Sequence, residues 1–138
     1  MTSTLDMQDL RYLNLFAQIT KVNTRYFFEY NNMLVFCVPR KLIKQALGQN
    51  AENLKKMSSI VGKRIRVVAQ PDGVEDAKEF IERVISPLTF NNLEITTNEI
   101  IMNAGRMNKA LLIGREKRRL NEMQNIIKYF FKRDFKII

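Results

Sequence analysis

The sequence predicts an α+β protein made of two similar units, each a three-stranded sheet covered by helices. Three observations lead to this prediction. The 138 residues suffice for one ordinary domain or two small ones. The second half of the chain repeats the first at a shift of 66 residues, which places Gly48 on Gly114 and Met57 on Met123. Each half also carries the same order of local signals: helix, strand, strand, helix, helix and strand.

The first unit is expected to open with a helix that ends near Thr20 and is capped by Thr4 or Asp6. Its predicted apolar face consists of Leu10, Leu13 and Ala17. Two runs rich in aromatic and branched residues follow, Arg25–Tyr30 and Met33–Val38. Asn31-Asn32 separates them, and because Asn tolerates the left-handed conformation, these runs predict a tight hairpin.

Two helices and a strand are predicted to complete this unit. Pro39 is expected in the first turn of a short helix that runs to Leu47, and the chain breaks at 48–50. A second helix ends at Gly62. Its apolar positions are Leu54, Met57, Ile60 and Val61. The run 64–70 alternates basic and apolar residues, as expected for a strand with one solvated face.

The turn signal Pro71-Asp72-Gly73 predicts the domain boundary, with one domain at 1–71 and the other at 72–138. Asp72 and Glu75 have the spacing of a capping box for the first helix of the second unit. That helix stops before Pro87 and presents an apolar face of Val74, Ala77, Ile81, Val84 and Ile85. The remaining predicted elements are a hairpin of 93–97 and 99–103, helices at 106–113 and up to Phe131, and a strand at 134–138.

The repeat extends through most of both helices. Further pairs at the shift of 66 are Arg40 with Arg106, Leu47 with Ile113, Leu54 with Leu120, Ile60 with Ile126 and Val61 with Ile127. Three extra residues in the second copy then place Lys63-Arg64 on Lys132-Arg133. Two copies indicate a duplication, since a solenoid needs at least about three repeats to bury a core.

The net charge of +9 is concentrated in two blocks. Residues 40–70 hold eight bases and one acid, and residues 106–136 hold ten bases and three acids. Each block therefore carries +7 and the remainder carries −5. Such blocks favour two surfaces that face a polyanion. The alternative is that Lys and Arg merely cover solvated helix faces.

Enzymatic chemistry and membrane insertion are both disfavoured. The chain has no His and one Cys, which excludes Ser-His-Asp and Cys-His catalysis, histidine zinc sites and an intramolecular disulfide. No phosphate-binding or nucleophile-elbow motif occurs, and the acids of 75–82 simply follow helical spacing. No run approaches the ~18 apolar residues of a membrane span. We expect a cytoplasmic protein without cofactor, metal or small-molecule substrate, and not an enzyme.

Two strings resemble the signature of KH domains, in which a glycine-led loop joins two helices. They are Ala46-Leu47-Gly48-Gln49-Asn50-Ala51-Glu52-Asn53-Leu54-Lys55-Lys56 and Leu112-Ile113-Gly114-Arg115-Glu116-Lys117-Arg118-Arg119-Leu120. The element order looks like the type II form, and the tail 131–138 is similar to the end of the second KH domain of archaeal NusA-like proteins. The resemblance covers nearly the whole chain. It implies two tandem type II KH domains that bind single-stranded RNA, in a transcription elongation or termination factor that works with RNA polymerase.

In this family the loop clamps the RNA backbone, while the bases lie in a groove between the helices and the last strand. The glycines let a phosphate approach the peptide N–H groups at a helix N-terminus. Carried over to this chain, the resemblance and the charge predict RNA contacts at fourteen positions. They are Arg40, Gly48, Gln49, Asn50, Ala51, Lys55, Lys63, Arg66, Arg106, Gly114, Arg115, Glu116, Lys117 and Arg118.

The second glycine of the signature is replaced in both copies. It is Ala51 in the first, which is tolerated if the backbone there is helical, and Lys117 in the second. Glu116 opposes RNA unless it pairs with Arg119 or caps the helix. These departures keep two alternatives open: a module that docks on RNA polymerase or another protein, and RNA binding in ribosome assembly or translation.

The aromatic run of the first hairpin allows a stacking platform for bases. Its members are Tyr26, Phe27, Phe28 and Tyr30. The alternative is that these rings fill the core between sheet and helices. Cys37 lies in an apolar strand and is expected to be buried and inert.

Overall fold

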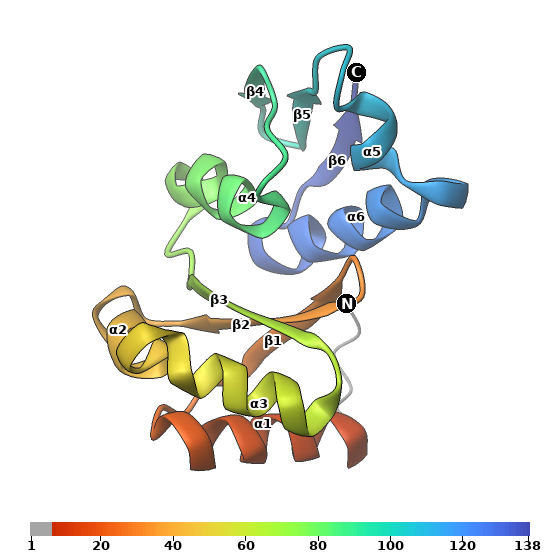
Figure 1. The fold of residues 1–138 in the computed structure, drawn as a ribbon. Helices are drawn as coiled ribbons and strands as arrows, with labels where there is room; N and C mark the ends of the chain where they lie inside the picture. The colour runs from red at the N-terminus through yellow and green to blue at the C-terminus, as the bar shows by residue number, and fades with distance from the viewer. Residues whose placement is uncertain (1–6) are drawn as a thin grey trace. The chain divides into compact units, whose positions relative to one another are not determined.

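The computed structural model describes residues 7–138, and the chain divides into two compact units, one ending at Gln70 and one running from Pro71 to Ile138. Each unit is α+β with its own three-stranded sheet (Figure 1). The proposed helix caps Thr4 and Asp6 lie outside the described residues.

The first unit consists of α1 (Met7–Thr20), β1 (Tyr26–Tyr30), β2 (Met33–Val38), the 3₁₀ turn η1 (Arg40–Leu42), α2 (Ile43–Leu47), η2 (Gln49–Ala51), α3 (Glu52–Val61) and β3 (Arg64–Ala69). The order agrees with the prediction. β1 pairs antiparallel with β2, and β2 pairs parallel with β3. The helices α1, α2 and α3 lie on one side of this sheet (Figure 1).

The hairpin turn has the predicted geometry, because Asn31 and Asn32 both adopt positive φ, at 51° and 61°. A turn with two such residues matches the twist of the flanking strands. The helix after the hairpin differs from the prediction. Pro39 precedes it in an extended conformation (φ −54°, ψ 140°), and a 3₁₀ turn comes before α2.

The core of the first unit lies between the sheet and the helices. Phe16 of α1 stacks on Phe36 of β2 with ring centroids 4.2 Å apart. Phe16, Leu34 and Met57 are fully buried. Two predicted core positions were wrong: Leu10 is 43% exposed and Ile60 is 58% exposed. The inward face of α1 is centred on Phe16, so the predicted helix face was rotated away from the true one.

The second unit consists of the 3₁₀ turn η3 (Val74–Asp76), α4 (Ala77–Ile85), β4 (Asn92–Ile95), β5 (Glu99–Asn103), α5 (Lys109–Ile113), η4 (Arg115–Lys117), α6 (Arg118–Phe131) and β6 (Asp134–Ile137). β4 pairs antiparallel with β5, and β5 pairs parallel with β6. Phe80 of α4 meets Phe131 of α6 edge to face, with centroids 5.8 Å apart.

Two local predictions for this unit were wrong. The Asp72–Glu75 capping box is absent, and the carboxylate of Asp76 instead accepts the Asp72 N–H at 2.9 Å. The short helix begins at Lys109 rather than Arg106, because a turn occupies 106–108.

The strand registers also correct the sequence repeat. Arg64 lies opposite Met33, and Asp134 lies opposite Glu99. Since Met33 and Glu99 are themselves separated by the repeat shift of 66, Arg64 corresponds to Asp134 and not to Arg133. The second copy therefore has one more extra residue before its last strand than the alignment of the basic pairs gave.

None of the helices between residues 7 and 138 combines the length and apolar character needed to cross a bilayer.

Candidate nucleic-acid interface

The two glycine-led loops have the same backbone conformation. Gly48 has φ 75° and ψ 176°, and Gly114 has φ 79° and ψ 169°. The third and fourth residues of each loop are left-handed, with φ of 55° and 57° at Asn50 and Ala51. The matching values in the second unit are 55° and 61°. The condition under which Ala51 would be tolerated, a helical backbone, is therefore not met, and Ala51 adopts a conformation that favours glycine.

Gly48 is packed against the helix that follows it. A Cβ atom on Gly48 would lie 2.9 Å from Cγ of Asn53, closer than a side chain permits. Asn53 Nδ2 donates to the carbonyl oxygens of Gln45 and Ala46, each at 3.2 Å. Asn53 thus ties the start of α3 to the end of α2 beneath the loop, a role that was not assigned from sequence although the residue stands in the quoted string.

Arg119 has the corresponding role in the second unit. Its Nη1 donates to the carbonyl oxygen of Leu111 at 3.1 Å, and a Cβ on Gly114 would lie 3.0 Å from its Cγ. Leu111 is the repeat partner of Gln45. Of the two alternatives considered for Glu116, neither an ion pair with Arg119 nor a helix cap is present among residues 7–138.

Most of the predicted loop residues are accessible. Gln49, Asn50, Arg115, Glu116, Lys117 and Arg118 are exposed, and Gly48, Ala51 and Gly114 are half-buried. Neither α3 nor α6 has a side-chain hydrogen bond to its N-cap. The first N–H group of each helix, that of Glu52 or Arg118, donates to the carbonyl oxygen of Gln49 or Arg115 within the loop. What each loop offers an anion is therefore the positive end of the helix dipole.

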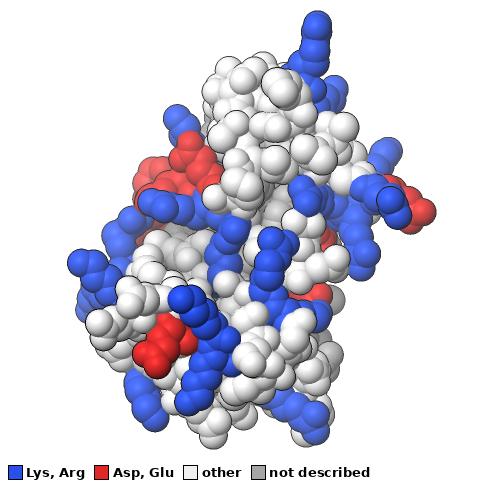
Figure 2. All heavy atoms as spheres, viewed as in Figure 1, with Lys and Arg blue, Asp and Glu red and all other residues white. Residues whose placement is uncertain are grey.

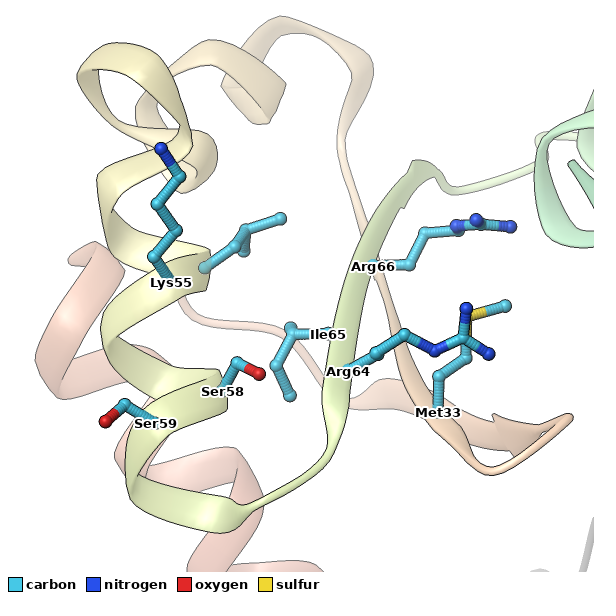
Figure 3. A pocket seen from close by; sticks show the side chains of 8 residues that line it. Met33, Lys55, Ser58, Ser59, Arg64, Ile65 and Arg66 are labelled. Atoms are coloured by element: carbon cyan, nitrogen blue, oxygen red, sulfur yellow. The ribbon is translucent and has the colours of Figure 1, made fainter. Parts of the chain in front are cut away.

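A groove of about 520 Å³ lies beside the first loop, between α3 and the edge strand β3. It is lined by Met33, Leu54, Lys55, Ser58, Ser59, Arg64, Ile65 and Arg66. In Figure 3, Ser58 and Ile65 face the space between helix and strand, whereas Arg64, Arg66 and Met33 project from the other side of β3. The lining therefore combines apolar surface, hydroxyls and three cations, without a carboxylate.

The three cations of this groove differ in their exposure and in their hydrogen bonds. The Lys55 side chain is exposed, and Arg64 Nη2 donates to the Asn31 carbonyl oxygen at 3.4 Å. Burial, together with the neighbouring Arg64 charge, lowers the pKa of Arg66 from its usual value.

Lys63, Arg40 and Arg106 are not among the residues that line this groove. Lys63 Nζ forms an ion pair with Glu29 at 3.2 Å. Arg40 and Arg106 are exposed, Arg40 in η1 and Arg106 in the turn before α5. Sequence reasoning missed Arg64, Ser58 and Ser59 as lining residues. The available signal for Arg64 was its spacing of two from Arg66, which puts both on one face of a strand.

Lys and Arg side chains are distributed over the viewed surface in several groups, and Asp and Glu are fewer (Figure 2). The aromatic run is not part of this surface. Phe27, Phe28 and Tyr30 are buried, and Tyr26 is half-buried. These rings therefore fill the core and do not form an exposed platform for stacking bases. Cys37 is fully buried, and burial raises its pKa to about 12, which removes it as a nucleophile at neutral pH.

No family model matches the sequence. It is 27% identical over 89 residues to a protein of Methanococcus vannielii named "Probable transcription termination protein NusA". The chain is similar to NusA. The matched region covers 64% of this chain and 50% of the relative, so it spans about half of the relative's length.

The fold is similar to the solved structure titled "Crystal structure of APE1850", with a TM-score of 0.64 and 19% identity. That likeness covers 97% of this chain and 99% of the other. At this identity it concerns the fold alone. The sequence comparison thus gives a distant similarity to one NusA-named protein, and the structural comparison gives a shared α+β fold that is compatible with a KH-like fold.

Proposed function

We propose that the chain binds single-stranded RNA through two tandem type II KH domains, at 1–71 and 72–138, and acts on nascent transcripts in transcription elongation or termination. The observation that carries the proposal is the shared loop geometry. Each loop begins with a glycine, continues to two left-handed residues and ends at the N-terminus of a helix that has no side-chain cap hydrogen bond. The NusA similarity supports the transcriptional setting and a contact with RNA polymerase.

The mechanism is binding, without a chemical step. Phosphates approach the loops, where the N-terminus of α3 or α6 supplies partial positive charge. Basic side chains add affinity that depends on salt because they displace counterions. In the first unit, bases enter the α3–β3 groove, where Leu54 and Ile65 give apolar contact and hydroxyls give hydrogen bonds.

The test is titration of the purified chain with fluorescent oligo(A), oligo(C) and oligo(U) at low and moderate salt. Saturable binding that persists at moderate salt, with different affinities among the three RNAs, supports the proposal. Binding that vanishes above low salt and ignores sequence contradicts it. The nucleic acid that co-purifies from cells distinguishes the setting, since nascent transcripts indicate transcription and ribosomal RNA indicates ribosome assembly or translation.

One observation favours a second candidate, docking on RNA polymerase or another protein. Ala51 and Lys117 put side chains at the loop position where the KH signature has glycine, and Glu116 adds an exposed acid. A protein that binds polymerase in a pull-down after ribonuclease treatment, and shows no selective RNA binding, would have this function instead.

A further inference from the structure

The two units differ in charge at corresponding positions of their paired strands. In the first groove, Met33, Arg64 and Arg66 stand where the strand registers place Glu99, Asp134 and Lys136 in the second unit. Arg64 of β3 thus corresponds to the acidic Asp134 of β6 and the neutral Met33 to Glu99, whereas Arg66 corresponds to Lys136, which is also basic. The second set is neutralised by its own ion pairs. Lys136 Nζ lies 3.6 Å from Glu99 Oε1, and Lys128 Nζ lies 3.3 Å from Asp134 Oδ1.

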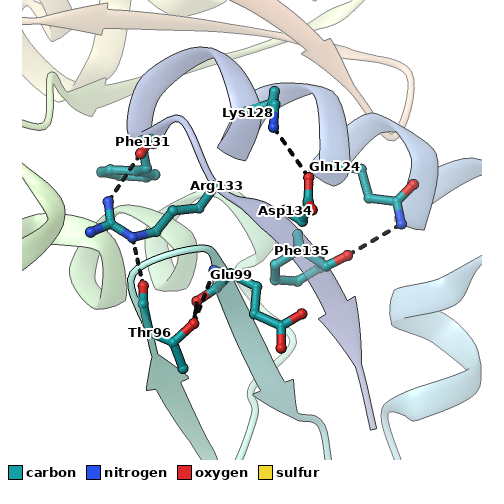
Figure 4. Close-up of polar contacts among 8 residues, drawn as sticks. All are labelled: Thr96, Glu99, Gln124, Lys128, Phe131, Arg133, Asp134 and Phe135. Atoms are coloured by element: carbon teal, nitrogen blue, oxygen red, sulfur yellow. Dashed lines mark hydrogen bonds and ion pairs between the residues drawn. The ribbon is translucent and has the colours of Figure 1, made fainter.

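Side chains also bridge the helix and strand of the second unit (Figure 4). Gln124 of α6 donates to the carbonyl oxygen of Phe135 in β6 at 3.2 Å, and Lys128 reaches Asp134 across the same two elements. The repeat partner of Gln124 is Ser58, whose hydroxyl donates to the Lys63 carbonyl oxygen at 2.7 Å, before β3 begins. The shorter side chain leaves the space between α3 and β3 open in the first unit.

At the loops, the second unit is the more basic of the two, whereas at the paired strands the first unit is the more basic. The second loop and its next residue contain three exposed bases, Arg115, Lys117 and Arg118, and one acid, Glu116. The corresponding residues of the first unit contain no base and one acid, Glu52. Phosphate affinity therefore concentrates at the second loop, whereas the open cationic groove belongs to the first unit.

Resting on the proposed RNA-binding function, we infer that the two units divide the work of recognition. The first unit selects bases in the α3–β3 groove. The second unit holds the RNA backbone through Arg115, Lys117 and Arg118 and has little base selectivity, because Gln124 and Lys128 bridge α6 and β6 at the corresponding place. Phosphate contacts position an RNA, and base contacts specify its sequence.

A matched pair of bulky substitutions tests the groove assignment. Ser59→Phe fills the first groove from an exposed position of α3, and Asn125→Phe makes the same change at the repeat position of α6. Affinities for oligo(A), oligo(C) and oligo(U) are measured for both variants and the unmodified chain. Ser59→Phe is expected to abolish the difference among the three RNAs, while Asn125→Phe preserves it. If both variants lose the difference in affinity among the three RNAs equally, or if Asn125→Phe alone loses it, the inference is overturned.

The triple variant Arg115→Gln, Lys117→Gln and Arg118→Gln tests the loop assignment. Each lost phosphate contact on a single strand lowers the slope of log affinity against log salt by about 0.7, so three lower it by about 2. Affinity falls for all three RNAs alike and their ranking is kept. A changed ranking with an unchanged slope would assign base selection to the second unit.

Two controls separate failure of this inference from failure of the proposed function. Unchanged thermal midpoints show that each variant is folded. An unmodified chain that binds no RNA contradicts the proposed function itself. An unmodified chain that binds all RNAs equally at moderate salt leaves RNA binding in place and overturns base selection by the first unit.

Discussion

Gly48 and Asn53 form a close contact in which the glycine leaves room for the amide that fastens two helices together. A Cβ on Gly48 would come within 2.9 Å of the Asn53 side chain, and Asn53 Nδ2 bonds the last carbonyls of α2. The loop conformation and the helix junction therefore depend on one another. This coupling makes Gly48 a structural requirement of the candidate interface.

Gly48→Ala is expected to destabilise the first unit by about 1–3 kcal/mol, because its φ and ψ lie in a region almost restricted to glycine and the new methyl meets Asn53. Urea unfolding measures the change. Gly62→Ala is the matched control, since Gly62 also has positive φ but nothing lies within 4 Å of its Cβ position. If Gly48→Ala lowered the free energy of unfolding by less than Gly62→Ala does, the contact between the new methyl group and Asn53 would be contradicted.

Ala51→Gly is expected to raise the free energy of unfolding by up to about 1 kcal/mol, since Ala51 has φ 57° and a left-handed non-glycine residue costs about that much. Lys117→Gly should act in the same direction, with φ 61°. The same measurement on Ala110→Gly gives the opposite sign, because Ala110 is exposed within α5 and glycine costs about 1 kcal/mol there. Destabilisation by Ala51→Gly would show that the loop is not left-handed at that residue.

The sequence was informative where structure depends on neighbouring residues. Asn31-Asn32 specifies its hairpin turn and Gly62 ends α3, because both need positive φ at a known place. The left-handed conformation of Ala51 and Lys117 had no such signal, since neither residue favours it. It follows from Gly48 and Gly114 and from the junctions made by Asn53 and Arg119.

Long-range pairing accounts for what the sequence did not reveal. The register that puts Asp134 opposite Glu99 depends on contact between β5 and β6, so matching basic pairs along the chain misplaced it by one residue. The inward face of α1 was likewise assigned to Leu10 rather than Phe16, since both fit a helical period and only packing on Phe36 decides between them. The groove residues Ser58 and Ser59 became identifiable only once β3 was placed beside α3.

Stability is expected to fall above pH 9 through Cys37. Burial raises the pKa of its thiol from 9.0 to about 12, so the unfolded chain loses this proton at lower pH than the folded chain. The stabilisation is complete below pH 9 and is lost between pH 9 and about 12, at about 1.4 kcal/mol per pH unit. Other groups titrate in this range, so the measurement is the difference in unfolding free energy between the unmodified chain and Cys37→Ala. A pH-independent difference would contradict the assigned burial.

Reversing the charge of the second loop should weaken RNA binding at every sequence. Lys117→Glu with Arg118→Glu replaces two exposed cations at the N-terminus of α6 by anions, which repel phosphate where the helix dipole would otherwise attract it. The control is Lys21→Glu with Lys78→Glu, which makes the same change in net charge at exposed positions outside both loops. Fluorescence titration should show a much larger loss for the loop variant, equal among oligo(A), oligo(C) and oligo(U). Equal losses in the two variants would mean that net charge alone attracts RNA, and the second loop would then have no special part in holding it.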